Sequence, residues 1–197
     1  MRLLLLCIVI LAGLAGYGYL HWGDHRMFTT NEPSEFESLH IKAEKGDADA
    51  QFNLGRCYYD GLGVTQDKAE ALKWTEKAAA QGIPEAQMMV GLSYWLGMDV
   101  KMDETNGVKW FKKAAEQGEP GGFFYLGAAY YLGKGVGQNY VESYKWTLLF
   151  KESGSSVIPS DTADVDYKLA DLKGKMTPEQ IEEAKRLAKE EKAQIFK

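Results

Sequence analysis

Residues 72–82 read LKWTEKAAAQG, and residues 108–118 read VKWFKKAAEQG. A Trp, a Lys, two Ala and a final Gly therefore return after 36 residues, and Lys145 and Trp146 open a third copy at the same interval. Self-similarity at a fixed period of about 20 to 50 residues is typical of repeat architectures. The chain is therefore expected to be built from stacked copies of one unit.

Three blocks align without a gap, at residues 47–82 (repeat 1), 83–118 (repeat 2) and 119–154 (repeat 3). Equivalent positions hold the same residue in every block, namely Gly55, Gly91 and Gly127; Tyr58, Tyr94 and Tyr130; Gly61, Gly97 and Gly133; and Lys73, Lys109 and Lys145. Such recurrence within one chain indicates that each position does the same structural work in each unit.

The first half of each block has the pattern of a helix. In repeat 1, Ala50, Leu54 and Cys57 fall on one face of a helix near residues 49–60. A Gly inside a helix costs about 1 kcal/mol relative to Ala. The threefold return of the glycine at position 55 therefore indicates that another helix passes too close for a Cβ.

The second half of each block predicts a second helix. Asp67 with Glu70 three residues later resembles a capping box, and Ala71, Trp74 and Ala78 form a stripe for burial. Gly82 is expected to end the helix in the left-handed conformation. Because one helical hairpin cannot bury both of its faces, neighbouring hairpins must stack, which predicts an all-α, right-handed α-solenoid.

The ends of the repeat array differ from its middle. Residues 36–46 are expected to form an N-terminal cap helix, and residues 155–197 two C-terminal capping helices. Thr177 followed by Pro178 is a strong start signal for the last helix. An apolar stripe that would close the last repeat follows, consisting of Ile181, Ala184, Leu187 and Ala188.

The chain begins with an apolar segment. Arg2 is followed by 18 residues without a charge, residues 3–20, so residues 1–23 are expected to be either a signal peptide or a membrane anchor helix. Residues 24–35 are polar and contain a Pro, as in a linker. We expect the rest of the chain to be exported to a bacterial periplasm, attached to the inner membrane or released by cleavage.

Composition and motifs argue against several classes of function. A net charge of -5 and an isoelectric point near 5.3 disfavour a general nucleic-acid binder. The three repeats contain no His, so no His-dependent catalytic set can be built within them. Residues 133–138, GKGVGQ, lack the spacing of a phosphate-binding loop. We therefore predict no catalytic residues, no metal site, no cofactor and no enzymatic activity.

The block DADAQFNLGRCYYDGLGVTQDKAEALKWTEKAAAQG, residues 47–82, resembles a Sel-one-like repeat (SLR), a relative of the tetratricopeptide repeat. The resemblance covers residues 47–154 and departs from the pattern at Asp99, where the loop expects Gly, at Gly122 for Ala, and over residues 147–154. It implies a non-enzymatic adaptor for protein partners or envelope assemblies.

Residues that vary between repeats on the first helices are candidates for partner binding, since these helices line the concave face in this architecture. Arg, Met and aromatic residues are enriched at interface hot spots. The candidate set consists of Asn53, Arg56, Tyr59, Asp60, Met89, Leu92, Trp95 and Tyr125. The aromatic column of Tyr59, Trp95 and Tyr131 is open to a second interpretation, as a packing layer.

Two classes of function remain on this basis. The first is a monomeric, membrane-tethered scaffold that binds a protein partner as an assembly adaptor or regulator, with an immunity-type inhibitor of a secreted toxin as a variant. The second is a cell-wall-associated hydrolase. Among the structural residues, the Trp column is predicted to be buried, and Trp110, which has a repeat on either side, is predicted to matter most for stability.

Overall fold

The computed structural model describes residues 34–155 and 165–197, and these residues fold into nine helices and no strands. The expected leader of residues 1–23 and residues 24–33 of the expected linker lie outside the described residues. The helices are α2 (Glu35–Glu44), α3 (Ala48–Asp60), α4 (Lys68–Ala80), α5 (Pro84–Leu96), α6 (Glu104–Ala115), α7 (Pro120–Leu132), α8 (Tyr140–Glu152), α9 (Val165–Gly174) and α10 (Pro178–Ile195).

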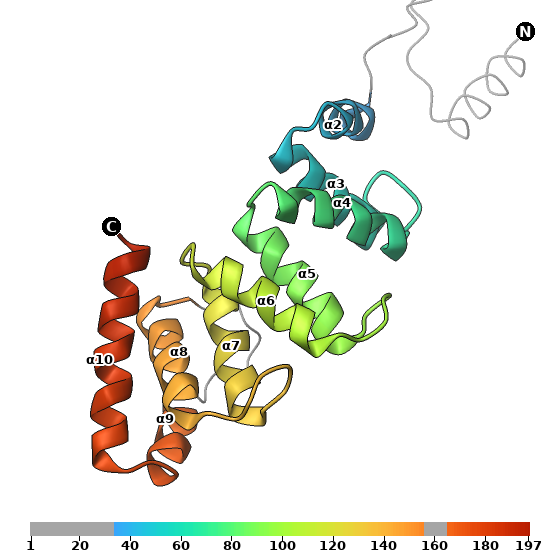
Figure 1. Ribbon diagram of the computed structural model, residues 1–197. Helices are drawn as coiled ribbons and strands as arrows, with labels where there is room; N and C mark the ends of the chain where they lie inside the picture. The colour runs from blue at the N-terminus through green and yellow to red at the C-terminus, as the bar shows by residue number, and fades with distance from the viewer. Residues whose placement is uncertain (1–33, 156–164) are drawn as a thin grey trace, which may run out of the picture. The chain divides into compact units, whose positions relative to one another are not determined.

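The repeats form successive helical hairpins, α3 with α4, α5 with α6 and α7 with α8 (Figure 1). Each second helix also packs against the first helix of the next repeat, so most contacts join elements that are neighbours in sequence. This arrangement is that of a solenoid, in which each unit is stabilised mainly by its neighbours. The prediction of an all-α solenoid is confirmed.

The recurring glycine of the first helices lies where the second helix of the same repeat passes closest. A Cβ on Gly55 would stand 2.5 Å from Thr75 Oγ1, and one on Gly91 would stand 2.6 Å from the Phe111 ring. A Cβ on Gly127 would stand 2.8 Å from Thr147 Oγ1. These separations are far below van der Waals contact, which confirms the prediction of a close helical approach.

The second helix of repeat 1 begins at the predicted cap, but the expected capping box is only half made. The Asp67 carboxylate accepts hydrogen bonds from the backbone N–H groups of Ala69 and Glu70, both at 3.0 Å. The Glu70 side chain does not return to the cap. It accepts instead from Lys73 Nζ at 2.9 Å, one turn further along the helix. A lysine at this spacing therefore competes with the cap for the carboxylate.

The Trp column is buried at its two ends but not in the middle, contrary to the prediction for Trp110. Trp74 and Trp146 are 6% and 3% exposed, whereas Trp110 is only partly buried and carries the Lys113 amine 4.1 Å above its ring. The next residue, Phe111, is fully buried at 0% exposure. In repeat 2, Phe111 is therefore the central core residue.

The N-terminal end of the array starts one residue earlier than predicted. Helix α2 begins at Glu35, and Ser34 forms a capping box with Glu37. Ser34 and Glu35 therefore belong to the helix and its cap rather than to the linker of residues 24–35. The reciprocal pair of hydrogen bonds satisfies two backbone donors that would otherwise lack partners, which explains why the helix extends to this residue.

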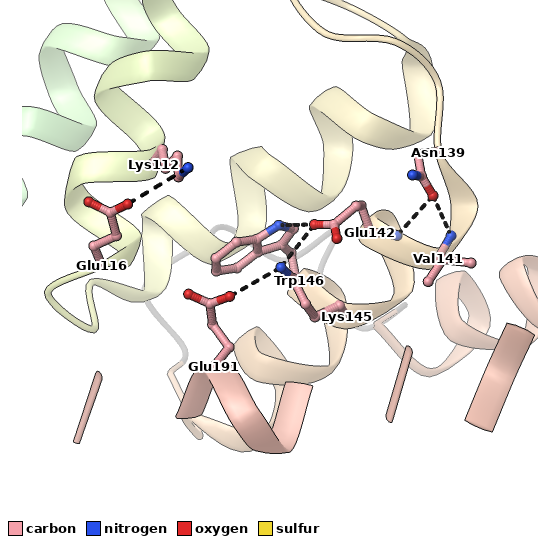
Figure 2. A network of polar contacts seen from close by, with 8 residues as sticks. All are labelled: Lys112, Glu116, Asn139, Val141, Glu142, Lys145, Trp146 and Glu191. Atoms are coloured by element: carbon pink, nitrogen blue, oxygen red, sulfur yellow. Dashed lines mark hydrogen bonds and ion pairs between the residues drawn. The ribbon is translucent and has the colours of Figure 1, made fainter. Parts of the chain in front are cut away.

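The C-terminal end is closed by α10, which packs along α8 (Figure 1). Thr177 caps α10 and forms a capping box with Gln180, which confirms the predicted start signal. Where α10 covers α8, it buries Lys145 to 7% exposure. The Lys145 ammonium lies 2.9 Å from Glu142 and 3.2 Å from Glu191, so α10 supplies one of its two carboxylate partners (Figure 2).

None of the helices formed by residues 34–155 and 165–197 combines the length and the apolar character that a bilayer-spanning helix requires.

Candidate functional site

Four of the predicted partner-binding residues lie on α3 and reach solvent. Asn53, Arg56 and Asp60 are exposed, and Tyr59 is 37% exposed. Within the described part of the chain, the Arg56 guanidinium forms no ion pair. An exposed arginine without an internal partner retains all five of its donors for another molecule.

Met89 and Leu92 lie on α5 and are half-buried, because they form part of a pocket between repeats 1 and 2. The pocket measures about 80 Å³, and Tyr59 forms part of its wall. Helix α4 contributes Lys68, Ala71, Leu72 and Thr75, while α5 and the loop after it contribute Ser93, Met98 and Asp99. Three of the predicted residues are thereby brought together, in a mostly apolar pocket with one cation and one anion among its lining residues.

Trp95 and Tyr125 lie deeper than the predicted binding surface. Trp95 is 9% exposed, and its ring meets Phe111 edge-on with the centroids 5.9 Å apart. Its Nε1–H donates to the backbone carbonyl of Lys134 at 3.5 Å. Tyr125 stacks on Phe111 at 4.9 Å, and burial raises the pKa of its phenol. For Trp95 the structure favours the packing interpretation that the sequence left open, and Tyr125, which was predicted only as a partner-binding residue, packs in the same ring cluster.

The sequence-based set missed the half of the pocket that comes from α4 and from the loop between α5 and α6. Lys68, Thr75 and Met98 lie there, and none of them was expected at a site. A signal was present, because position 75 is Thr in repeats 1 and 3 but Phe in repeat 2. Asp99 departs from the repeat pattern, and its φ of 59° lies in the left-handed region, where repeats 1 and 3 have Gly63 and Gly135.

A second apolar feature lies at the C-terminal ends of the first helices. Leu96 and Leu132, at equivalent positions of α5 and α7, are 52% and 53% exposed. Met102, in the loop that follows α5, is 57% exposed. Single exposed apolar side chains are common on protein surfaces, so these positions do not by themselves define an interface.

The chemistry that these groups offer is that of binding. No cluster of three His, Cys, Asp or Glu side chains suited to a metal occurs in the described ranges. Burial raises the pKa of the Cys57 thiol, with Arg56 opposing the shift, so its thiolate form is disfavoured at neutral pH. An apolar pocket with a few polar groups at its rim can hold a side chain of a partner and select it by shape and charge.

Comparison with known proteins accounts for this architecture. The family model for the Sel1 repeat matches residues 48–83, 84–119, 124–155 and 163–190. The chain belongs to the Sel1 repeat family. The fourth match falls on α9 and α10, whose helices both pack against α8.

Two solved structures are similar in fold and in sequence. A Sel1 repeat protein from Oxalobacter formigenes is 34% identical, with a TM-score of 0.60, over 68% of this chain and 96% of that protein. A protective antigen of uropathogenic Escherichia coli with an SLR fold is 42% identical, with a TM-score of 0.58, over 59% of this chain and 25% of the antigen.

The curated relatives are much longer proteins. The ERAD-associated E3 ubiquitin-protein ligase component HRD3A of Arabidopsis thaliana is 38% identical over 30% of this Sel1 chain and 9% of its own length. The chain spans between 9% and 11% of the length of the curated relatives it matches. Sel1 repeat proteins are in general non-catalytic scaffolds that bind other proteins.

Proposed function

We propose that this Sel1 repeat protein is an exported, monomeric, non-enzymatic adaptor that holds a protein partner against its first helices. The observation that carries the proposal is the exposed set on α3, which includes Arg56 and from which Tyr59 reaches the pocket lined by Met89 and Leu92. Position 56 is Arg, Leu and Ala in the three repeats. Leu92 and Ala128 pack against the core, whereas Arg56 at the end of the array is exposed and is available to select a partner.

The proposed place of action is the periplasmic side of a bacterial inner membrane. Support comes from the sequence of residues 1–23, in which Arg2 precedes an uncharged apolar run. An alkaline phosphatase fused to the C-terminus is expected to be active. An inactive fusion, with an active cytoplasmic reporter at the same site, would refute export. N-terminal sequencing of the mature protein distinguishes a cleaved leader from a retained anchor.

Partner binding is tested with two matched double variants of the full chain used as bait on solubilised membranes. Arg56→Ala with Leu92→Ala alters the first-helix face, while Lys73→Ala with Lys109→Ala alters exposed positions on the second helices. True hot spots cost about 2 kcal/mol or more of binding, or roughly a thirtyfold loss. The first variant should lose a protein that the wild type and the second variant both retain. Equal retention would contradict the proposed face.

A further inference from the structure

The contact between repeats 2 and 3 (the second seam) is filled by aromatic rings, while the contact between repeats 1 and 2 (the first seam) contains the pocket. The rings of the second seam pack on one another, with Phe111 stacked on Tyr125 and meeting Trp95 edge-on. Equivalent positions of the first seam, 36 residues earlier, are Thr75, Met89 and Tyr59, and all three line the pocket.

The entrance differs between the seams as well. In the second seam, Lys134 from the loop after α7 forms an ion pair at 3.7 Å with Glu104 at the start of α6. The equivalent residues of the first seam are Met98 and Lys68, which cannot form an ion pair. Within the described ranges no carboxylate lies within ion-pair distance of the Lys68 ammonium. The first seam therefore lacks the ion pair that spans the second, and among the described residues Lys68 lines its pocket without a direct ion-pair partner, with Asp99 as the one anion of the same lining.

The backbone conformation of the loops also favours a closed entrance in the second seam and an open entrance in the first. Gly135, with a φ of 75°, lies so close to α6 that a Cβ there would collide with the carbonyl oxygen of Glu104. Its equivalent in repeat 2 is Asp99, which has a φ of 59° and a Cβ. A Cβ is incompatible with the close approach that Gly135 makes to the start of α6. The loop of residues 97–103, which carries Asp99, therefore cannot approach the start of α4 as closely.

We propose that the pocket of the first seam binds an aromatic side chain of a protein segment that carries a carboxylate beside it. The segment supplies the ring that Phe111 supplies internally in the second seam, and its carboxylate replaces the partner that Lys68 lacks. This inference rests on the proposed function, since it names the chemistry by which the first-helix face recognises its partner.

The lining suits such a ring. A pocket of about 80 Å³ has room for several water-sized groups, since one water needs about 10 to 15 Å³ of such space. Met89 and Met98 offer thioether sulfurs, which make favourable contacts with aromatic rings. Lys68 at the start of α4 offers the charge. A leucine-sized group would make the apolar contacts but would lack the sulfur–ring contacts.

The test uses the full chain labelled with ¹³C at the methionine methyl groups, titrated with N-acetyl-phenylalanine. Ring currents are expected to shift the methyl signals of Met89 and Met98, with saturation, while those of Met102 and Met176 stay in place. N-acetyl-leucine should bind more weakly. N-acetyl-phenylalaninamide should bind roughly threefold more weakly than the acid, as expected for one exposed charge pair, and Lys68→Gln should remove that difference.

Two independent variants close the pocket by copying the second seam. Thr75→Phe places a ring over Gly55 as Phe111 lies over Gly91, and Lys68→Glu with Met98→Lys copies the ion pair of Glu104 and Lys134. The second variant changes only the rim, so it stays informative if Thr75→Phe does not fold. Asp99→Asn is the matched control, because Asn tolerates the left-handed conformation, and it should bind the acid at least as well as the wild type.

Loss of the Met89 shift in both closed variants, with retention in Asp99→Asn, supports the proposal. Shifts that persist in the closed variants, that spread equally to Met102, or that N-acetyl-leucine reproduces at the same concentration would overturn it. The proposed function fails separately. If the wild-type chain captures no membrane protein, the adaptor proposal falls, while the methyl shifts still decide whether the pocket takes a ring.

Discussion

Replacing Phe111 with Ala should destabilise the protein far more than replacing its neighbour Trp110. Phe111 is 0% exposed and packs between Trp95 and Tyr125. An aromatic side chain buries about 150 Å² or more, which at about 25 cal/mol per Å² corresponds to roughly 4 kcal/mol, within the range observed for such truncations. Trp110 is only partly buried, so its truncation should cost about half as much or less.

Urea unfolding followed by circular dichroism measures the difference. With a slope of about 2 kcal/mol per M, Phe111→Ala should lower the midpoint by about 2 M. Phe111→Leu is the matched control, because it keeps most of the apolar volume and should cost about 1 to 2 kcal/mol. A midpoint for Trp110→Ala that is as low as that of Phe111→Ala would refute the assignment of Phe111 as the central core residue of repeat 2.

Three further predictions concern packing and charge. Gly107→Ala should cost about 1 to 3 kcal/mol, because its Cβ would stand 2.8 Å from the carbonyl oxygen of Gly91; thermal unfolding measures the loss. Lys145→Met should destabilise by about 3 kcal/mol, because it removes the buried cation with which two carboxylates form ion pairs. Lys109→Met, at the equivalent exposed position, should be neutral in urea unfolding. Asp171→Asn should destabilise at pH 7, and the difference from the wild type should shrink as the pH falls below the unfolded pKa, because the Lys175 ammonium lowers the pKa of the Asp171 carboxyl.

The sign of the last prediction follows from linkage. The folded state binds a proton on Asp171 more weakly than the unfolded state does, so the carboxylate contributes stability above the unfolded pKa of about 3.9. That contribution disappears as the pH falls through the lowered pKa of the folded state. Unfolding midpoints of the wild type and of Asp171→Asn that differ equally at pH 7 and at pH 3 would contradict the assignment.

Controls separate the packing effects from general effects of substitution. Gly174→Ala introduces a Cβ into open space at the end of α9, so it should be neutral or slightly stabilising where Gly107→Ala destabilises. If both glycine variants behave alike, the close approach of α5 and α6 is not what selects glycine at position 107. Equal losses of stability for Lys145→Met and Lys109→Met would likewise show that the burial of Lys145 by α10 does not contribute to stability.

The hairpins and their stacking were predictable from the sequence because the residues that determine them recur. Gly55 and its equivalents mark the close approach of two helices, and Asp67 marks a helix start. Thr177 with Pro178 marks another. Each of these signals acts within a few residues or within one hairpin, so it can be recognised from the sequence alone, inside the repeats for Gly55 and Asp67 and beyond them for Thr177.

The identity of the central core residue was not predictable from the column alone. Trp110 shares its column with two buried tryptophans, but two other positions of the same helix differ in repeat 2. Gly107 stands where repeats 1 and 3 have a larger residue, and Phe111 stands where they have a smaller one. The glycine allows closer approach, and the phenylalanine then takes the core. The effect of these two paired changes on packing can be recognised only when the positions of α5 and α6 relative to each other are known.

The pocket was beyond prediction for a related reason. Tyr59 and Met89 were candidates because they lie on the first helices, but the pocket also needs Lys68 and Thr75 from α4 and the loop that carries Asp99. These groups come together only through the contact between two repeats. Comparison of equivalent positions in adjacent seams shows why one is open and the next is filled.

The central claim is that a protein partner binds the first-helix face. The most direct measurement is site-specific photo-crosslinking in cells, with a photoreactive phenylalanine at the exposed position of Asn53 on α3 or, as the matched control, at the exposed position of Lys109 on α6. A discrete crosslinked protein is expected from position 53 and not from position 109. The same product from position 109 alone, or no product from either position, would contradict the claim.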